Sequence, residues 1–204
     1  MNRVGLHGVA LYMTGYKHLT TSNVPVTTLE DMQGVKFRAM ASPILLAQFK
    51  ALGANALSIP FAEVYNALQS GVAEGQENLY WAIHKMRFFE VQKYLSVSRH
   101  GLIVVAVLMS KSWWDKLPAE LQTLVTKVFN EAEKVTWEVA ERIDQEAVKA
   151  MQAAGLQFVT ISPEERERFR QATVDVKQVY IQRVGTTGKR LLEMIEADIA
   201  EVAK

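Results

Sequence analysis

Hydrophobic residues in the first half of the chain form short runs separated by polar turns. Gly5–Met13 is apolar and favours a strand, whereas Lys17–Thr28, which is rich in Thr and Ser, is typical of a connecting loop. The elements predicted after it are a helical turn at 28–34, strands at 35–39, 56–59 and 72–77, and helices at 42–53 and 60–70. This alternation of strands and helices predicts a parallel α/β sheet with right-handed crossovers.

The second half begins with a segment rich in Val, Leu and Ile at 94–109, which favours another strand. Residues 118–154 contain no internal Pro or Gly, and their apolar residues recur every three or four positions. They predict one amphipathic helix of about 55 Å, long enough to run across two lobes. A strand at 156–161, a helix from Ser162-Pro163, a break at Gly185–Gly188 and a last helix complete the chain.

The composition excludes several classes of protein. The 204 residues are 49% hydrophobic and 22% charged, and the net charge of +1 gives no electrostatic argument for nucleic acid or an anionic membrane. Cysteine is absent, which excludes disulfides, thiolate catalysis and Cys-based zinc sites. No window reaches the roughly 18 apolar residues needed to span a membrane. The N-terminus also lacks the apolar core of a signal peptide.

The standard catalytic and phosphate-binding motifs are missing, and the four histidines lie too far apart in sequence to suggest a metal site. Arg38 is the first candidate for chemistry. It lies at the end of the predicted strand VKFRA, where α/β sheets bind ligands, and the helix that begins at Ser42-Pro43 follows it directly. A guanidinium group can hold a carboxylate with two hydrogen bonds. The alternative is a surface arginine paired with a nearby acidic residue.

Asn78 is the second candidate, within the stretch GQENLYW that follows another predicted strand. Its amide can donate to a carboxylate and accept from a hydroxyl, although an Asx-turn before the next helix is an alternative. Strand alternation would place Gln76 on the same side as Asn78 and turn Glu77 toward a structural partner. Trp113-Trp114 is interpreted as packing at a helix start rather than as a sugar platform.

Several blocks together resemble one known family. The stretches DMQGVKFRAMASP, ALGANALSIPFAEVYNALQSGVAEGQEN, FFEVQKYLSVSRH and KSWWDKLPAELQ are similar, in order and spacing, to solute-binding proteins of tripartite ATP-independent periplasmic (TRAP) transporters. The group that they resemble binds C4-dicarboxylates and sialic acid. The similarity covers about the last two-thirds of the family pattern, so the signal peptide and the opening part of the first lobe are expected to be missing.

The resemblance implies two α/β lobes with a ligand cleft between them. It assigns residues 14–100 mainly to one lobe with the carboxylate site, 101–117 to crossing strands, 118–154 to a helix that spans both lobes, and 155–204 to a C-terminal strand and helices. It also implies a periplasmic protein that captures an organic acid for a TRAP membrane permease, with no enzymatic activity, cofactor or metal.

Family positions carry over onto six residues of this chain. Arg38 would be the dominant carboxylate ligand and Asn78 a second contact. Phe61 would be a pocket aromatic, and Lys17 falls where the family commonly has Arg, so its contact would lack the planar fork. Ser42 and His100 are candidates for the cleft wall. Two alternatives remain open at this stage: an α/β enzyme that uses Glu77 or His100 as general acid–base beside Arg38, and a truncated chain without binding function.

Overall fold

The computed structural model describes residues 4–202, which divide into two compact units. Residues 19–77, 91–97 and 157–202 form the first, called here the sheet unit. Residues 4–18, 78–90 and 98–156 form the second, called here the helix–ribbon unit. Two long strands, β1 (Leu6–Thr21) and β5 (Tyr94–Ser110), contribute residues to both units. The predicted lobe at 14–100 therefore also contributes to both.

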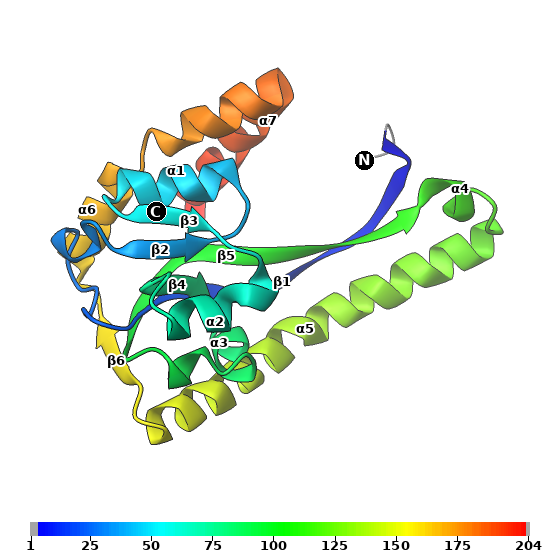
Figure 1. Ribbon diagram of the computed structural model, residues 1–204. Coiled ribbons are helices and arrows are strands. Elements are labelled where there is room, and N and C mark those ends of the chain that lie inside the picture. The colour runs from blue at the N-terminus through cyan, green and yellow to red at the C-terminus, as the bar shows by residue number, and fades with distance from the viewer. Residues whose placement is uncertain (1–3, 203–204) are drawn as a thin grey trace. The chain divides into compact units, whose positions relative to one another are not determined.

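The sheet unit is organised around a six-stranded sheet with the order β3-β2-β4-β1-β5-β6 (Figure 1). The short strands are β2 (Lys36–Ala39), β3 (Asn55–Ser58), β4 (Gly75–Asn78) and β6 (Gln157–Thr160). Strand β2 pairs in parallel with β3 and β4, and β5 pairs in parallel with β6, as the alternating pattern predicts. The α/β class is confirmed, but the sheet as a whole is mixed. Strands β1 and β5 run antiparallel, with Lys93 N–H donating to Thr21 O and Lys111 N–H to Gly5 O.

Serine–proline pairs begin two helices of the sheet unit. Helix α1 (Pro43–Ala51) starts with Ser42, whose hydroxyl accepts from Leu45 N, and α6 (Pro163–Ala172) starts with Ser162, whose hydroxyl accepts from Glu165 N. The other helical segments are the 3₁₀ turns η2 (Glu30–Met32) and η3 (Phe61–Glu63), α2 (Val64–Gln69) and α7 (Val176–Val202). The last two helices were predicted to break only at Gly185–Gly188. Helix α7 is indeed kinked at Gly185, where φ is 67°, but a further break at 173–175 separates α6 from α7.

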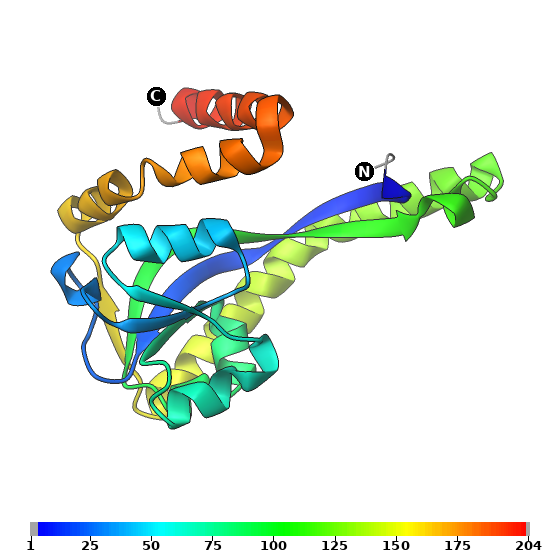
Figure 2. The same ribbon diagram turned by 45° about the horizontal axis from the view of Figure 1, so that its top comes forward.

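The core of the sheet unit lies beneath α1. The rings of Phe37 and Phe49 are stacked 4.6 Å apart, and both side chains are fully buried. Phe169 of α6 packs against the same cluster, and α7 packs on α1 (Figure 2). A Cβ atom at Gly75 of the neighbouring strand β4 would lie 2.5 Å from the Phe37 ring. A residue with a side chain would therefore clash with the core at this position.

The helix–ribbon unit consists of a two-stranded antiparallel ribbon and four helical segments. The first part of β1 and the last part of β5 form the ribbon, and the helical segments are α3 (Tyr80–Lys85), η4 (Phe88–Glu90), α4 (Lys111–Trp114) and α5 (Ala119–Ala153). Helix α5 has 35 residues and lies along the ribbon, where Tyr12 OH donates to Phe129 O at 2.9 Å (Figures 1 and 2). Trp114 is buried and Trp113 half exposed at the end of α4.

The loop predicted at 17–28 is wrong for its first five residues. Strand β1 continues to Thr21, and Lys17, His18, Thr20 and Thr21 are buried. Threonine is β-branched and suits a strand, and the polar group of Thr20 is satisfied because its hydroxyl accepts from Gln76 Nε2 at 2.8 Å. The polarity of this segment therefore belongs to a buried strand rather than to a solvated loop.

Candidate carboxylate site and a neighbouring aromatic pocket

Arg38 is held at the carboxyl end of β2, where its backbone lies between Leu57 of β3 and Gln76 of β4. Its side chain is only 2% exposed, and its Nε donates to Ile59 O at 2.9 Å. The terminal Nη nitrogens form no hydrogen bond to any other residue in the part of the chain that the structure describes. The alternative of an exposed arginine paired on the surface is therefore wrong, because this guanidinium group is buried and keeps donors for a further partner.

Two side chains of the sheet unit, Glu77 and Phe61, interact with the guanidinium group of Arg38. Burial lowers the pKa of Arg38, and the negative charge of Glu77, itself 1% exposed, opposes that effect. Phe61 lies with its ring centroid 5.8 Å from the guanidinium carbon and is 43% exposed. This is a cation–π contact, so the structure brings Arg38 and Phe61 together.

The other polar residues near the strand ends of the sheet unit have structural roles. Gln76 is fully buried and donates to Thr20, which gives its amide a protein partner. Ser42 caps α1, with 3.5 Å between its hydroxyl oxygen and Leu45 N. Its predicted role as part of a cleft wall stays a prediction beside this observed one.

Three of the six predicted residues lie in the helix–ribbon unit. Asn78 ends β4 and is 8% exposed, and the N-cap of α3 is Leu79 rather than Asn78. Lys17 is buried on β1, where its aliphatic stem lies across Gly101 of β5, 3.4 Å from the position of a Cβ atom there. His100 of β5 is hydrogen-bonded through Nδ1 to the hydroxyl of Ser98 at 2.6 Å. All three make further interactions.

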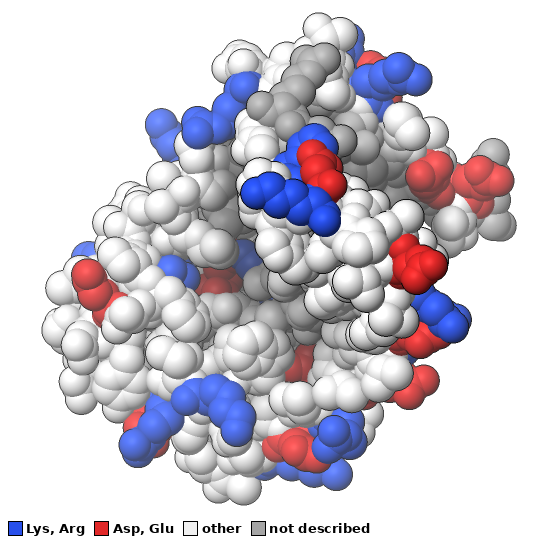
Figure 3. Space-filling model, turned by 90° about the vertical axis from the view of Figure 1, so that its right-hand side faces the viewer, with Lys and Arg blue, Asp and Glu red and all other residues white. Residues whose placement is uncertain are grey.

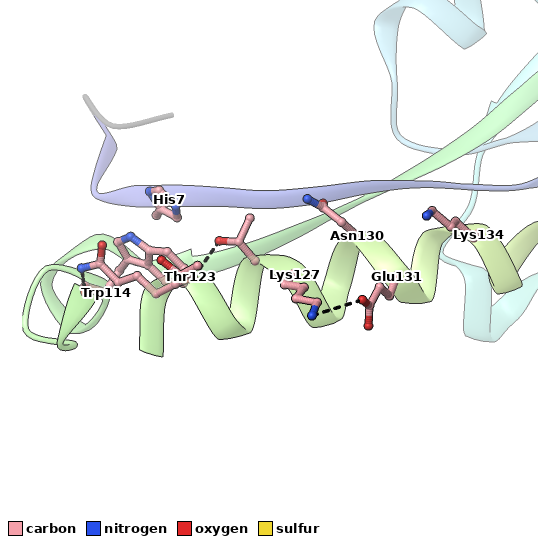
Figure 4. A pocket seen from close by; sticks show the side chains of 9 residues that line it. His7, Trp114, Thr123, Lys127, Asn130, Glu131 and Lys134 are labelled. Atoms are coloured by element: carbon pink, nitrogen blue, oxygen red, sulfur yellow. Dashed lines mark hydrogen bonds and ion pairs between the residues drawn. The ribbon is translucent and has the colours of Figure 1, made fainter. Parts of the chain in front are cut away.

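One groove of the helix–ribbon unit contains none of these candidates. It has a volume of about 630 Å³ and lies between β1 and α5 (Figure 4). His7 is stacked on Trp114 at 4.2 Å, and Asn130 points from α5 toward β1. Lys127 and Glu131 form a loose ion pair at 3.9 Å on the solvent side. The groove is open, and its charged groups are solvated.

A second pocket of the same unit was not foreseen. It has a volume of about 550 Å³ and is lined by β1, α3, β5 and α5, including Tyr16, His18, Tyr80, Trp137 and Asp144. Asp144 is partly buried and accepts from Trp81 N at 3.0 Å, and burial raises its pKa to about 6. Burial likewise raises the pKa of the Tyr80 phenol to about 12. These residues are far apart in sequence, so no local motif marks them.

Charge and metal chemistry add little to either region. On the face drawn in Figure 3, the basic and acidic side chains of the described residues are interspersed, and no large patch of one sign forms there. Among residues 4–202 there is no group of three or more His, Cys, Asp or Glu side chains placed to hold a metal ion. None of the helices formed by these residues is long and apolar enough to cross a bilayer.

A comparison with known protein families shows to which family the chain belongs. Residues 1–183 match bacterial extracellular solute-binding protein, family 7. The chain belongs to this family. The family 7 chain is 32% identical over 200 residues to the C4-dicarboxylate-binding periplasmic protein DctP of Vibrio cholerae, a match that covers 98% of this chain and 58% of that protein. It is 33% identical to the ectoine/5-hydroxyectoine-binding periplasmic protein UehA of Ruegeria pomeroyi, with 98% and 59% covered.

Solved structures confirm the fold of the family 7 chain. A TRAP periplasmic solute-binding protein from Desulfovibrio salexigens, with bound orotic acid, superposes with a TM-score of 0.91 at 35% identity and covers 97% of this chain. The periplasmic ectoine-binding protein of the TeaABC TRAP transporter from Halomonas elongata gives 0.92 at 28% identity and covers 98%. The chain spans 64% and 65% of those two structures, and 58% and 59% of the two relatives above. The TRAP resemblance deduced from the sequence is therefore confirmed.

Proposed function

We propose that this family 7 chain serves a TRAP transporter outside the cytoplasmic membrane, where it captures an organic acid and delivers it to membrane permease subunits. Relatives are named for C4-dicarboxylates, and solved neighbours hold succinate, orotic acid or galacturonate, all of which carry a carboxylate. The proposed activity of this chain is to bind the organic acid without converting it to a product.

The free donors of Arg38 are the observation that carries this proposal. A buried guanidinium group that, among residues 4–202, donates a hydrogen bond only through Nε offers the planar Nη pair to a carboxylate. Glu77 offsets part of the cost of burying the positive charge, so the cation is retained without blocking those donors. Asn78, Phe61, Lys17, Ser42 and His100 are proposed as further ligand contacts, with Phe61 supported by its contact to Arg38.

A thermal-shift screen of organic acids tests the proposal. A ligand at 100 times its dissociation constant adds about 2.7 kcal/mol to the free energy of unfolding, which raises the melting temperature measurably. We expect at least one carboxylic acid to stabilise the chain and to be recovered chemically unchanged. Conversion of the acid to a product would favour the enzyme alternative, and the absence of any stabilising acid would contradict the proposal.

Replacement of the arginine tests the named residue. Arg38→Ala should weaken acid binding at least about tenfold, because hydrogen bonds to charged groups contribute about 1.5–3 kcal/mol. Arg38→Lys should restore little, since lysine lacks the planar fork. Arg168→Ala is a matched control, because Arg168 is partly exposed and already paired with Glu30 and Glu165. Unchanged acid affinity in Arg38→Ala would refute the assignment.

A further inference from the structure

We infer that the pocket lined by Tyr16, Trp137 and Asp144 binds a small organic ammonium ion with an aromatic or apolar body. This pocket lies wholly within the helix–ribbon unit, and it contains none of the six residues proposed to contact the organic acid. The inference therefore adds a site of opposite charge preference to the proposed function. Its volume of about 550 Å³ is in the range of small-molecule sites.

The charge preference follows from Asp144. Its Oδ1 accepts from the backbone N–H of Trp81, at the start of α3, whereas Oδ2 has no hydrogen-bond partner among residues 4–202. The side chain is partly buried, and a desolvated carboxylate with an unused oxygen favours a cationic donor. The other charged residues of the lining, Arg99, Glu141 and Lys149, are exposed, so water screens them more strongly.

The absence of a side chain at Gly15 leaves space beside this carboxylate. Its φ is 126°, in the left-handed half of backbone space, and a Cβ atom there would lie 3.2 Å from Asp144 Oδ2. Any other residue would crowd the oxygen that the ammonium group would use. Glycine at this position therefore leaves Oδ2 uncrowded by a side chain from β1.

Aromatic rings form the remaining walls. Tyr16 and Trp137 meet edge to face with their centroids 6.2 Å apart, and His18 is stacked on Tyr80 at 3.9 Å. Indole and phenol faces attract cations and also cover apolar groups. The guanidinium carbon of Arg99 lies 5.8 Å from the centroid of the Tyr16 ring, so this ring already makes a cation–π contact within the chain. A compact amine would find both an ion-pair acceptor and aromatic surface.

The experiment uses 2-phenylethylammonium chloride as the probe and 2-phenylethanol as its uncharged analogue. Binding is measured on the 204-residue chain through the indole N–H resonance of Trp137, which is assigned by its loss in Trp137→Phe. We expect saturable binding of the ammonium ion in the millimolar range or tighter, and binding of the alcohol at least about tenfold weaker. Equal binding of both compounds, or no saturable shift with the ammonium ion, would overturn the inference.

Two variants locate the acceptor. Asp144→Asn keeps the side-chain oxygen for Trp81 N and removes only the charge, so it should weaken ammonium binding at least about tenfold. Glu141→Gln removes an exposed charge from the same lining and should change the affinity less than about threefold. Ammonium affinity that survives in Asp144→Asn, or falls equally in both variants, would show that Asp144 is not the acceptor. Because the probe carries no carboxylate, its failure would leave the organic-acid proposal untouched.

Discussion

Asp144→Asn should stabilise the protein at neutral pH. Asp144 lies on α5, partly buried beside Tyr80, and burial raises its pKa from 3.8 to about 6 despite the hydrogen bond that it accepts from Trp81 N. Asparagine has nearly the same shape and retains an acceptor for that N–H group. The substitution therefore removes the cost of burying the charge with little change in packing.

The magnitude follows from proton linkage. The folded state holds the Asp144 proton up to a pH of about 6, whereas the unfolded chain releases it near 3.8. The stabilisation from the neutral carboxyl is thus fully present below pH 3.8 and is lost as the pH rises through about 6. At 1.36 kcal/mol per pH unit the full loss is about 3 kcal/mol, and access of solvent through the pocket reduces it, so we expect about 1–3 kcal/mol.

Urea unfolding of both proteins at a series of pH values measures this difference. The free energy of unfolding of Asp144→Asn minus that of the wild type should increase between about pH 4 and about pH 7 and stay constant above that. Glu141→Gln, on an exposed residue of the same helix, provides the control and should show no such trend. Parallel pH curves for wild type and Asp144→Asn would refute the account of Asp144 as an incompletely compensated buried carboxyl.

Two further substitutions test the packing and the helix starts of the sheet unit. Gly75→Ala places a Cβ atom 2.5 Å from the Phe37 ring and 2.9 Å from Thr20 O, so it should lower the free energy of unfolding by about 1–3 kcal/mol. Gly101→Ala, whose nearest neighbour would lie at 3.4 Å, is its control, and equal urea midpoints for both would contradict this packing. Ser162→Ala should cost about 1 kcal/mol in the same assay through loss of the α6 cap, and an unchanged midpoint would argue against that cap.

Helices and strands that are specified by residues close together in the sequence could be predicted from it. The Ser-Pro starts of α1 and α6 and the short alternating strand β2 depend on residues next to one another, and the structure confirms them. The continuation of β1 to Thr21 could not be predicted in the same way. It depends on a partner 56 residues away, Gln76, that satisfies Thr20 and makes a polar segment acceptable inside the sheet.

In the candidate site, too, some features follow from the local sequence and others depend on residues that are distant in sequence. The position of Arg38 at a strand end follows from the sequence pattern, whereas its low exposure and the charge contribution of Glu77 depend on neighbouring strands. The pocket around Asp144 gave no sequence signal at all, because its walls come from β1, α3, β5 and α5. Periodicity identifies the apolar stripe of α5 but does not show which of its many polar residues turns inward.

Gln76 and Glu77, near the end of β4, show how a buried strand can compensate the burial of its polar groups. Gln76 has a neutral hydrogen-bond partner in Thr20, so its burial is compensated inside the sheet unit. Glu77 acts on the charge of Arg38, and each group reduces the cost of burying the other. A buried guanidinium group whose donors were all bonded to a carboxylate of the chain would have few hydrogen bonds to donate to an organic acid. Within the described part of the chain Arg38 instead donates only through Nε, so the arrangement both retains the charge and leaves the planar fork available.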